Sequence, residues 1–226
     1  MLHSSPIGRV LLVLTTSGSG GHLRALKCSH AAHRERHPLM RDAEVALKST
    51  RALSPNFLAW FQRAFPNRVQ ALHVAPPRGH GQQEQVIETF VAALRPSALA
   101  RYDWVVVSNV DVVVVNATRL AGMLANPQTW AVLANCNPDR QCAAGCTRAL
   151  VHSDFFAFRP RRVRFHNETR TTHAETYVTK MFRATIALGR DAWIQARGFN
   201  DRSCRIRAGV RAGRPEVVHD HRHCFR

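Results

Sequence analysis

The chain is poor in lysine and has no long run of a single residue character. Lys27, Lys48 and Lys180 are the only lysines among 32 basic residues, and the acidic residues number 15. No stretch approaches the roughly 20 apolar residues that span a membrane, and the apolar run at residues 10–14 is too short for the core of a signal peptide. There is also no long polar tract, internal repeat or internal linker. These absences argue against wholesale disorder and predict a single domain over residues 1–226.

The charge balance is strongly basic, with a net charge of +17. Such a field attracts polyanions, among them nucleic acid, anionic lipid and nucleotide diphosphates. The arginines are scattered from Arg9 to Arg226, and only residues 159–164 are dense in them. Because no recognised DNA- or RNA-binding motif accompanies the charge, nucleic acid is not expected as the main partner.

Six cysteines, an even number, predict disulfide bonds in an oxidising compartment. Sequons at Asn116 and Asn167 would accept glycans there. We therefore expect a glycoprotein of the secretory-pathway lumen (Golgi or endoplasmic reticulum) or a secreted one, although no signal or anchor is visible. The alternatives are an intracellular protein and the catalytic portion of a longer chain. The spacing within residues 136–152 favours a disulfide-stapled loop over a zinc site. The cysteines are Cys28, Cys136, Cys142, Cys146, Cys204 and Cys224.

Apolar runs alternate with amphipathic segments along the chain. Runs such as residues 10–14 and 104–107 are typical of strands buried on both faces of a parallel sheet. The clearest helix covers residues 82–94, and Ser54-Pro55 begins another with a capping hydroxyl. This alternation predicts an α/β fold with a mainly parallel central sheet and helices on both faces. Further strands are expected at residues 43–47, 69–74, 112–115, 130–133 and 151–158 and from residue 217, and further helices at 22–37, 118–124 (with Thr118 as its cap) and 173–188, with residues 195–216 irregular.

The polar residues Asn109 and Asp111 follow one of these apolar strands. In open α/β sheets ligands bind at the carboxyl ends of the strands. A carboxylate there suits Mg²⁺ or Mn²⁺, the ions with which a sugar-nucleotide transferase neutralises its diphosphate leaving group. The alternative interpretation is that Asp111 only caps a turn between two strands.

The stretch from Tyr102 to Asp111 resembles the strand and Asp-x-Asp element of GT-A-type nucleotide-diphospho-sugar transferases, a class of glycosyltransferases. The chain is similar to uncharacterised algal and protist proteins related to them. The resemblance implies a single Rossmann-like GT-A domain, with a nucleotide-sugar-binding half at residues 8–135 and an acceptor-side half at residues 136–226. Asn109 stands where the family has its first carboxylate, so it could bind a ribose or a water but brings no charge.

Three acidic residues are candidates on the acceptor side. Asp154 lies in a stretch that resembles the TDFFAFRP strand of the related proteins, which implies a substrate contact. An inverting enzyme needs a carboxylate to deprotonate the acceptor hydroxyl. Glu175, which opens a helix, is the first candidate for this base, and Asp191, in a stretch that resembles GRDRW, is the second. The alternatives are a core strand around Asp154 and a glutamate placed for the helix dipole.

The tail contains His219 and His221 in a stretch that resembles the VVHDH ending of the related proteins. Many GT-A enzymes place a late histidine on the metal beside the aspartate, which implies Asp111 with His219 or His221 as metal ligands. Thr15 and Thr16 end the first strand before a glycine-rich loop and would lie near the nucleotide. The alternative for the two histidines is an exposed basic tail.

Three functions follow from these patterns. The first is a glycosyltransferase that moves a sugar from a nucleotide-diphosphate donor to an unknown glycan, protein or lipid acceptor, assisted by Mn²⁺ or Mg²⁺. The second is the same fold without turnover, which holds a nucleotide sugar or a glycan. The third is a basic polyanion-binding protein, whose affinity would fall steeply with salt.

Overall fold

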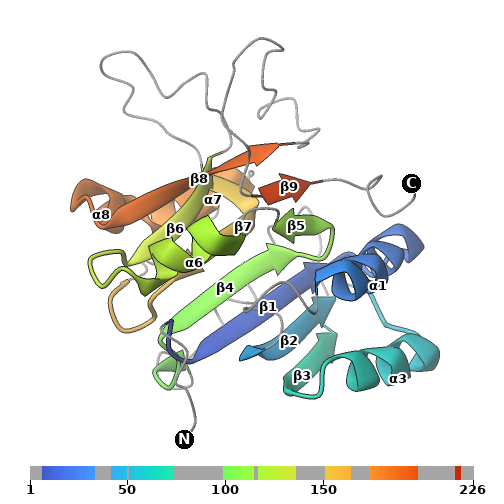
Figure 1. The fold of residues 1–226 in the computed structure, drawn as a ribbon. Helices are drawn as coiled ribbons and strands as arrows, with labels where there is room; N and C mark the ends of the chain where they lie inside the picture. The colour runs from blue at the N-terminus through green and yellow to red at the C-terminus, as the bar shows by residue number, and fades with distance from the viewer. Residues whose placement is uncertain are drawn as a thin grey trace, which may run out of the picture.

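A central sheet with helices against both faces forms the part of the chain that the structure describes (Figure 1). The computed structural model describes residues 7–33, 42–49, 51–73, 99–114, 117–135, 151–163, 174–197 and 217–219. Within these residues, no helix is long and apolar enough to cross a membrane.

The described strands follow the order β3-β2-β1-β4-β7-β6-β8-β9-β5 across the sheet. The strands are β1 (Val10–Thr16), β2 (Glu44–Ser49), β3 (Arg68–His73), β4 (Trp104–Asn109), β5 (Val112–Val114), β6 (Ala131–Asn135), β7 (Val151–Phe158), β8 (Asp191–Arg197) and β9 (Val217–His219). The helices are α1 (Gly20–His33), α3 (Pro55–Ala64), α6 (Ala117–Ala125), α7 (Ala174–Met181) and α8 (Arg183–Ala187).

The first four strands are all parallel, with β1 between β2 and β4 and with β3 outside β2. Strand β7 runs antiparallel between β4 and β6, and β6 and β8 are again parallel. The prediction of an α/β fold with a mainly parallel sheet is confirmed. The reversed strand β7 brings its first residues to the edge where β4 ends, which matters for the site.

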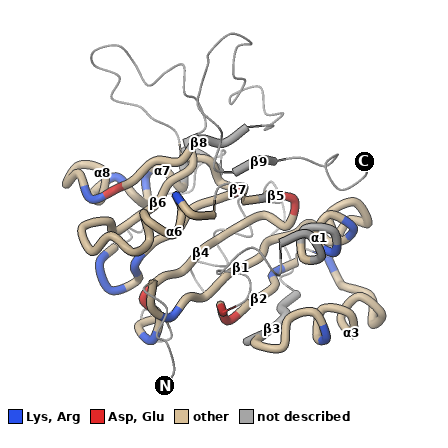
Figure 2. Tube along the Cα trace, viewed as in Figure 1, with Lys and Arg blue, Asp and Glu red and all other residues tan. Residues whose placement is uncertain are grey.

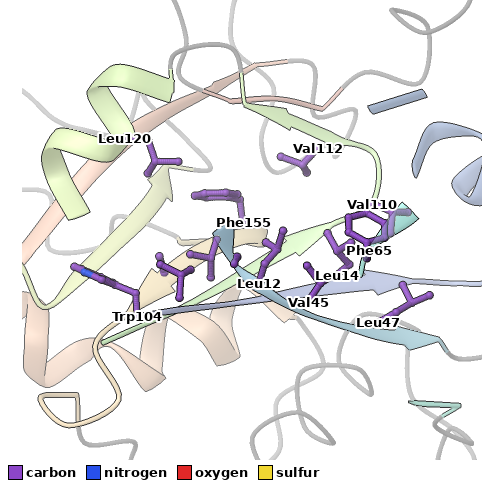
Figure 3. Close-up of a cluster of buried hydrophobic side chains, with 14 of the residues drawn as sticks. Leu12, Leu14, Val45, Leu47, Phe65, Trp104, Val110, Val112, Leu120 and Phe155 are labelled. Atoms are coloured by element: carbon purple, nitrogen blue, oxygen red, sulfur yellow. The ribbon is translucent and has the colours of Figure 1, made fainter. Parts of the chain in front are cut away.

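Two apolar cores lie on opposite faces of the sheet, because successive side chains of a strand point to opposite sides. In β4, Trp104 and Val106 pack into the first core, whereas Val105 and Val107 pack into the second. Figure 3 shows side chains of the first core gathered along β1, β2 and β4. Helix residues in the first core are Leu26 of α1, Phe57 and Phe61 of α3, and Leu120 and Leu124 of α6, and those in the second are Val178 and Met181 of α7.

Some helix boundaries agree with the prediction from the sequence and others do not. Ser54 caps α3 as predicted, since its Oγ accepts the N–H of Phe57 at 3.3 Å. Helix α6 begins at Ala117, so Thr118 lies inside its first turn and the expectation that it is the cap was wrong. The helix expected over residues 173–188 is two helices, because Phe182 interrupts it with φ −95° and ψ 3°.

One further expectation was wrong, and several others concern residues that the structure does not describe. Strand β8 covers Asp191–Arg197, where we expected a turn followed by irregular chain. The helix predicted at residues 82–94, the loop at 136–148 and the sequons at Asn116 and Asn167 lie outside the described residues.

Candidate functional site

The site forms where the parallel strands β1, β2 and β4 end together. In register, Thr15 of β1 pairs with Lys48 of β2 on one side and with Asn109 of β4 on the other. The last pair between β4 and β7 is Ser108 with Phe155, so the start of β7 lies at this edge too. We call it the carboxyl edge, and it is the place where open α/β sheets bind ligands.

Buried polar side chains gather at the carboxyl edge. Burying a polar group is costly unless it is hydrogen-bonded, so most strand ends avoid it. Of the eleven buried polar residues in the described part of the chain, nine lie at the carboxyl edge and only Thr129 and Thr185 lie elsewhere. The nine are Thr16, Lys48, Ser49, Ser108, Asn109, Asp111, His152, Ser153 and Asp154.

The turn between β4 and β5 is held by hydrogen bonds from the N–H of Val110. The N–H of Val110 donates to the carbonyl of Thr15 at 3.0 Å and to Oδ1 of Asn109 at 3.0 Å. The amide oxygen of Asn109 therefore accepts a hydrogen bond within the turn. Asp111 follows, and only 2% of this residue is exposed. Both interpretations of Asp111, a ligand and a residue of the turn between two strands, place it here.

A histidine in the first turn of α1, just after the glycine-rich loop, faces Asp111. Nε2 of His22 lies 3.4 Å from Oδ2 of Asp111. On the other side of the ring, Nδ1 lies 3.0 Å from Oγ of Ser17 and accepts the N–H of Ser17 at 3.3 Å. Gly18 makes this loop possible, since its φ of +70° is in the left-handed region and a Cβ would approach Ser49 Oγ to 2.8 Å.

The two threonines that end β1 support this loop. Oγ1 of Thr16 accepts the N–H of Gly18 at 3.1 Å, and Oγ1 of Thr15 donates to the carbonyl of Ser108 in a long contact of 3.5 Å. Thr16 is buried and Thr15 is half-buried. Both threonines thus lie at the carboxyl edge, where the sequence places them near a nucleotide.

The tail strand β9 reaches the same place. It pairs with β5 so that His219 stands opposite Val112, the residue after Asp111. The backbone of His219 is described, its side chain is not, and His221 lies outside the described residues. Among the described side chains there is no group of three His, Cys, Asp or Glu residues that could hold a metal ion. The described donors are the Asp111 carboxylate and the neighbouring His22 imidazole, two groups that suit a divalent transition-metal ion such as Mn²⁺.

The acceptor-side candidate Asp154 is buried at the start of β7. Its side chain is 5% exposed, and its backbone N–H donates to Nδ1 of His152 at 3.1 Å. That contact makes Nδ1 an acceptor, so Nε2 carries the proton when the His152 ring is neutral. Asp154 is the next residue of β7 beyond the Phe155–Ser108 pair, so it lies beside the end of β4.

Helix α7 brings Glu175 toward the carboxyl edge. Oγ1 of Thr179 accepts the N–H of Val151, the first residue of β7, at 2.9 Å. Three residues later, the ring of Phe182 lies 6.0 Å from that of Phe158 at the far end of β7. The helix therefore runs away from the carboxyl edge, and Glu175, one turn before Thr179, lies on the edge side. Its side chain lies outside the described part.

Asp191 is not brought together with the other candidates. It pairs with Ala131, which pairs with Phe158, which pairs with Val105 near the start of β4. This row crosses the opposite edge of the sheet, which we call the amino edge. Asp191 also accepts a hydrogen bond from Nε1 of Trp193. Asp191 therefore lies apart from the other candidates, and its role as the reserve base stays a prediction.

Sequence reasoning missed His22, Lys48 and His152. Lys48 is one of three lysines in the chain and ends a strand, and a rare residue at a strand end was a usable signal. Burial lowers the pKa of Lys48 from 10.5 to about 8. His22 follows the glycine-rich loop, which the sequence placed near a nucleotide without assigning a residue. No sequence signal separates His152 from a core position.

Comparisons with known proteins add to this geometry. No protein-family model matches the chain, and no curated protein sequence matches it. The galactosyltransferase LgtC, solved in complex with donor and acceptor sugar analogues, is 11% identical, with a TM-score of 0.50 over 92% of this chain and 86% of that chain. An active-site mutant of LgtC is 12% identical, with a TM-score of 0.50 over 96% of this chain and 91% of that chain.

A mannosyltransferase, PcManGT from Pyrobaculum calidifontis in complex with GDP-Man and Mn²⁺, is 13% identical, with a TM-score of 0.46 over 79% of this chain. This chain spans about half of that protein, 53% of its length. The two LgtC structures match almost from end to end. The chain therefore has the fold of the GT-A-type nucleotide-diphospho-sugar glycosyltransferases, as the stretch from Tyr102 to Asp111 predicted.

Proposed function

We propose that this protein is a metal-assisted glycosyltransferase that transfers a sugar from a nucleotide-diphosphate donor to an acceptor hydroxyl. One observation carries the proposal: a carboxylate, Asp111, is almost wholly buried at the carboxyl edge of a GT-A fold, beside a histidine and a glycine-rich loop. A carboxylate held out of water at the edge where open α/β sheets bind ligands is a candidate functional group.

The roles of the residues follow from their places. Asp111 and His219 would hold Mn²⁺ or Mg²⁺, with His221 as the alternative to His219. The ion would neutralise the diphosphate when it leaves. Thr15, Thr16 and Asn109, which border the same edge, would contact the nucleotide.

The acceptor side would be formed by β7 and α7. Asp154 would contact the acceptor beside the end of β4, and Glu175 would be the base that deprotonates its hydroxyl if the enzyme inverts. The acceptor itself is a glycan, a protein or a lipid. On the cysteines and sequons of the sequence, we propose that the protein acts in the secretory-pathway lumen, as a disulfide-bonded Golgi glycoprotein or a secreted one.

A second candidate function is a binding module that holds a nucleotide sugar without turnover. The observation that favours it is Asn109, which brings no charge and whose amide oxygen accepts the N–H of Val110. A third, polyanion binding, has less support. In the described part, Lys and Arg are spread over several elements (Figure 2).

Donor turnover separates these candidates. The chain would be incubated with a panel of nucleotide-diphospho-sugars, with and without Mn²⁺, and release of nucleoside diphosphate measured. The glycosyltransferase predicts Mn²⁺-dependent release from one donor, lost in Asp111→Ala. Binding of that donor without release would favour the binding module. Salt-sensitive binding of polyanions that survives Asp111→Ala would favour the third candidate.

A further inference from the structure

The proposed donor site has Asn109 where the Asp-x-Asp element has its first carboxylate, and this inference rests on the proposed function. Asn109 brings no charge, and its Oδ1 already accepts the N–H of Val110 at 3.0 Å. One carboxylate leaves most of the coordination shell of a divalent ion to water or substrate. Imidazole joins carboxylate in transition-metal sites, so a histidine within reach of Asp111 can replace the missing ligand.

His22 is such a histidine, and the chain holds it in place. Its Nε2 lies 3.4 Å from Oδ2 of Asp111, which is a suitable separation for two adjacent ligands of one ion. The His22 side chain keeps 22% of its surface exposed, whereas that of Asp111 keeps 1%, so an ion would reach the carboxylate past the ring. Oγ of Ser19 accepts the N–H of His22 at 3.3 Å and so fixes the first turn of α1.

Ser17 supplies the partner that a metal-binding imidazole requires. With Nδ1 accepting from Ser17, the neutral ring carries its proton on Nε2 and donates it toward Asp111. The hydroxyl of Ser17, 3.0 Å from Nδ1, can also accept. If the ring proton moved to Nδ1 through solvent, Nδ1 would give up the hydrogen bond from the Ser17 N–H and would donate to Ser17 Oγ instead. The Nε2 lone pair would then be available to the ion with no net change in protonation. Ligating histidines are commonly oriented by such a hydrogen bond on the other ring nitrogen.

We propose that His22 is a metal ligand of this site, paired with Asp111 in place of the carboxylate that Asn109 lacks. His219, whose backbone pairs with Val112, the residue after Asp111, would complete the protein's share of the shell. The glycine-rich loop then has two tasks. It turns the chain from β1 into α1, and it positions the imidazole of His22, the residue that follows it, next to the ion.

The test measures Mn²⁺ binding to the purified chain without nucleotide, from the loss of the electron paramagnetic resonance signal of free Mn²⁺. His22→Ala and His22→Gln are compared with wild type. Alanine favours the helix at this position. Glutamine keeps an N–H that can donate to Asp111 but is a poor ligand. His30→Gln is the matched control, because His30 lies on the same helix and contacts the carbonyl of Ala64 at 2.9 Å.

We expect the Mn²⁺ affinity to fall at least about tenfold in both His22 variants, and to stay within about threefold of wild type in His30→Gln. Ser17→Ala should lower the affinity about tenfold, since it removes the orienting hydroxyl. Thermal melting without metal shows that each variant is folded. Affinity retained in His22→Gln would overturn the proposal, because His22 would then only donate a hydrogen bond to Asp111.

Asp111→Asn separates this inference from the proposed function. If Asp111→Asn abolishes Mn²⁺ binding while His22→Ala leaves it unchanged, the metal site stands and the role of His22 is overturned. If wild type binds no Mn²⁺, both the ligand role of His22 and the metal-assisted mechanism are overturned. A nitrogen hyperfine coupling on bound Mn²⁺ that persists in His219→Ala and disappears in the His22→Ala, His219→Ala double variant would support direct ligation.

Discussion

The two edges of the sheet differ in how deeply their charged side chains are buried. At the amino edge, the carboxylate of Glu44 accepts from Arg9 Nε at 2.8 Å, from Arg101 at 3.1 Å and from the hydroxyl of Tyr102 at 2.7 Å. Asp103 there accepts the backbone N–H of Arg9 at 2.8 Å. Burial raises the pKa of Glu44, but the hydrogen bonds from Tyr102 and Arg9 outweigh it, so that the pKa falls below 4.5.

At the carboxyl edge, charged groups are buried more deeply. Lys48 is 4% exposed and Asp111 is 2% exposed, and burial alone is the cause that lowers the pKa of Lys48 to about 8. The amino edge uses its charges to hold strands together. The carboxyl edge keeps its charges out of water, which is a pattern that binding and catalytic sites show.

The largest effect should come from exchanging a carboxylate at each edge. Asp111→Asn should weaken Mn²⁺-dependent binding of a nucleoside diphosphate by about 100-fold or more, since it removes a charged ligand from the ion. Asp103→Asn, at the amino edge, should leave that binding unchanged. Isothermal titration of both variants measures the difference. Equal losses in the two variants would contradict the division between the edges.

A smaller effect is expected from Lys48→Met. Below pH 8 the wild-type chain buries a charged lysine, and the folded pKa of about 8 lies below the ordinary 10.5. The unfolded chain therefore holds this proton more tightly between pH 8 and 10.5, and the free energy of unfolding rises with pH across that window. Chemical denaturation should show this rise in wild type and not in Lys48→Met.

The same substitution also tests the function of the lysine. Lys48 pairs in register with Thr15 at the carboxyl edge, so we expect its cation to favour a bound diphosphate. Lys48→Met should then be more stable at pH 7, by about 1 kcal/mol, and bind nucleoside diphosphate about tenfold more weakly. Greater stability with unchanged binding would make Lys48 a structural residue.

The smallest effect belongs to the amino edge. Glu44→Gln should lower the free energy of unfolding by about 1 kcal/mol at pH 7 and leave nucleotide binding unchanged. Because the folded pKa of Glu44 is lowered, its contribution is present above pH 4.5 and is lost as the pH falls through the folded pKa. The stabilities of wild type and Glu44→Gln, measured by denaturation from pH 7 downward, should therefore converge in acid.

Much of the fold could be predicted from the sequence because apolar runs in α/β proteins are local signals. Residues 10–14 and 104–107 lie within strands of the central sheet, and Ser54 caps its helix. Strand β8 could not be predicted, because Asp191–Arg197 mixes polar and apolar residues beside a Gly-Arg turn signal. The direction of β7 was also hidden, since its uniformly buried side chains suit a parallel strand as well.

The site was predictable only in part. Asp111 was found because it follows an apolar strand and resembles a known element, and Asp154 was found through a similar resemblance. His22 belongs to the site through a contact across 89 residues of sequence, which no local pattern encodes. The position of Asp191 at the amino edge was hidden as well, because sequence does not tell which end of a strand meets the ligand edge.

Thermal stability with nucleoside diphosphates tests whether the carboxyl edge is a metal-assisted donor site. A ligand that binds only the folded chain raises the midpoint of unfolding by mass action. We expect the midpoint of unfolding to rise with one nucleoside diphosphate. The rise should require Mn²⁺, be absent in Asp111→Ala and be kept in Asp103→Asn. No rise with any nucleoside diphosphate, or a rise that Asp111→Ala retains, would contradict the claim that the carboxyl edge is a metal-assisted donor site.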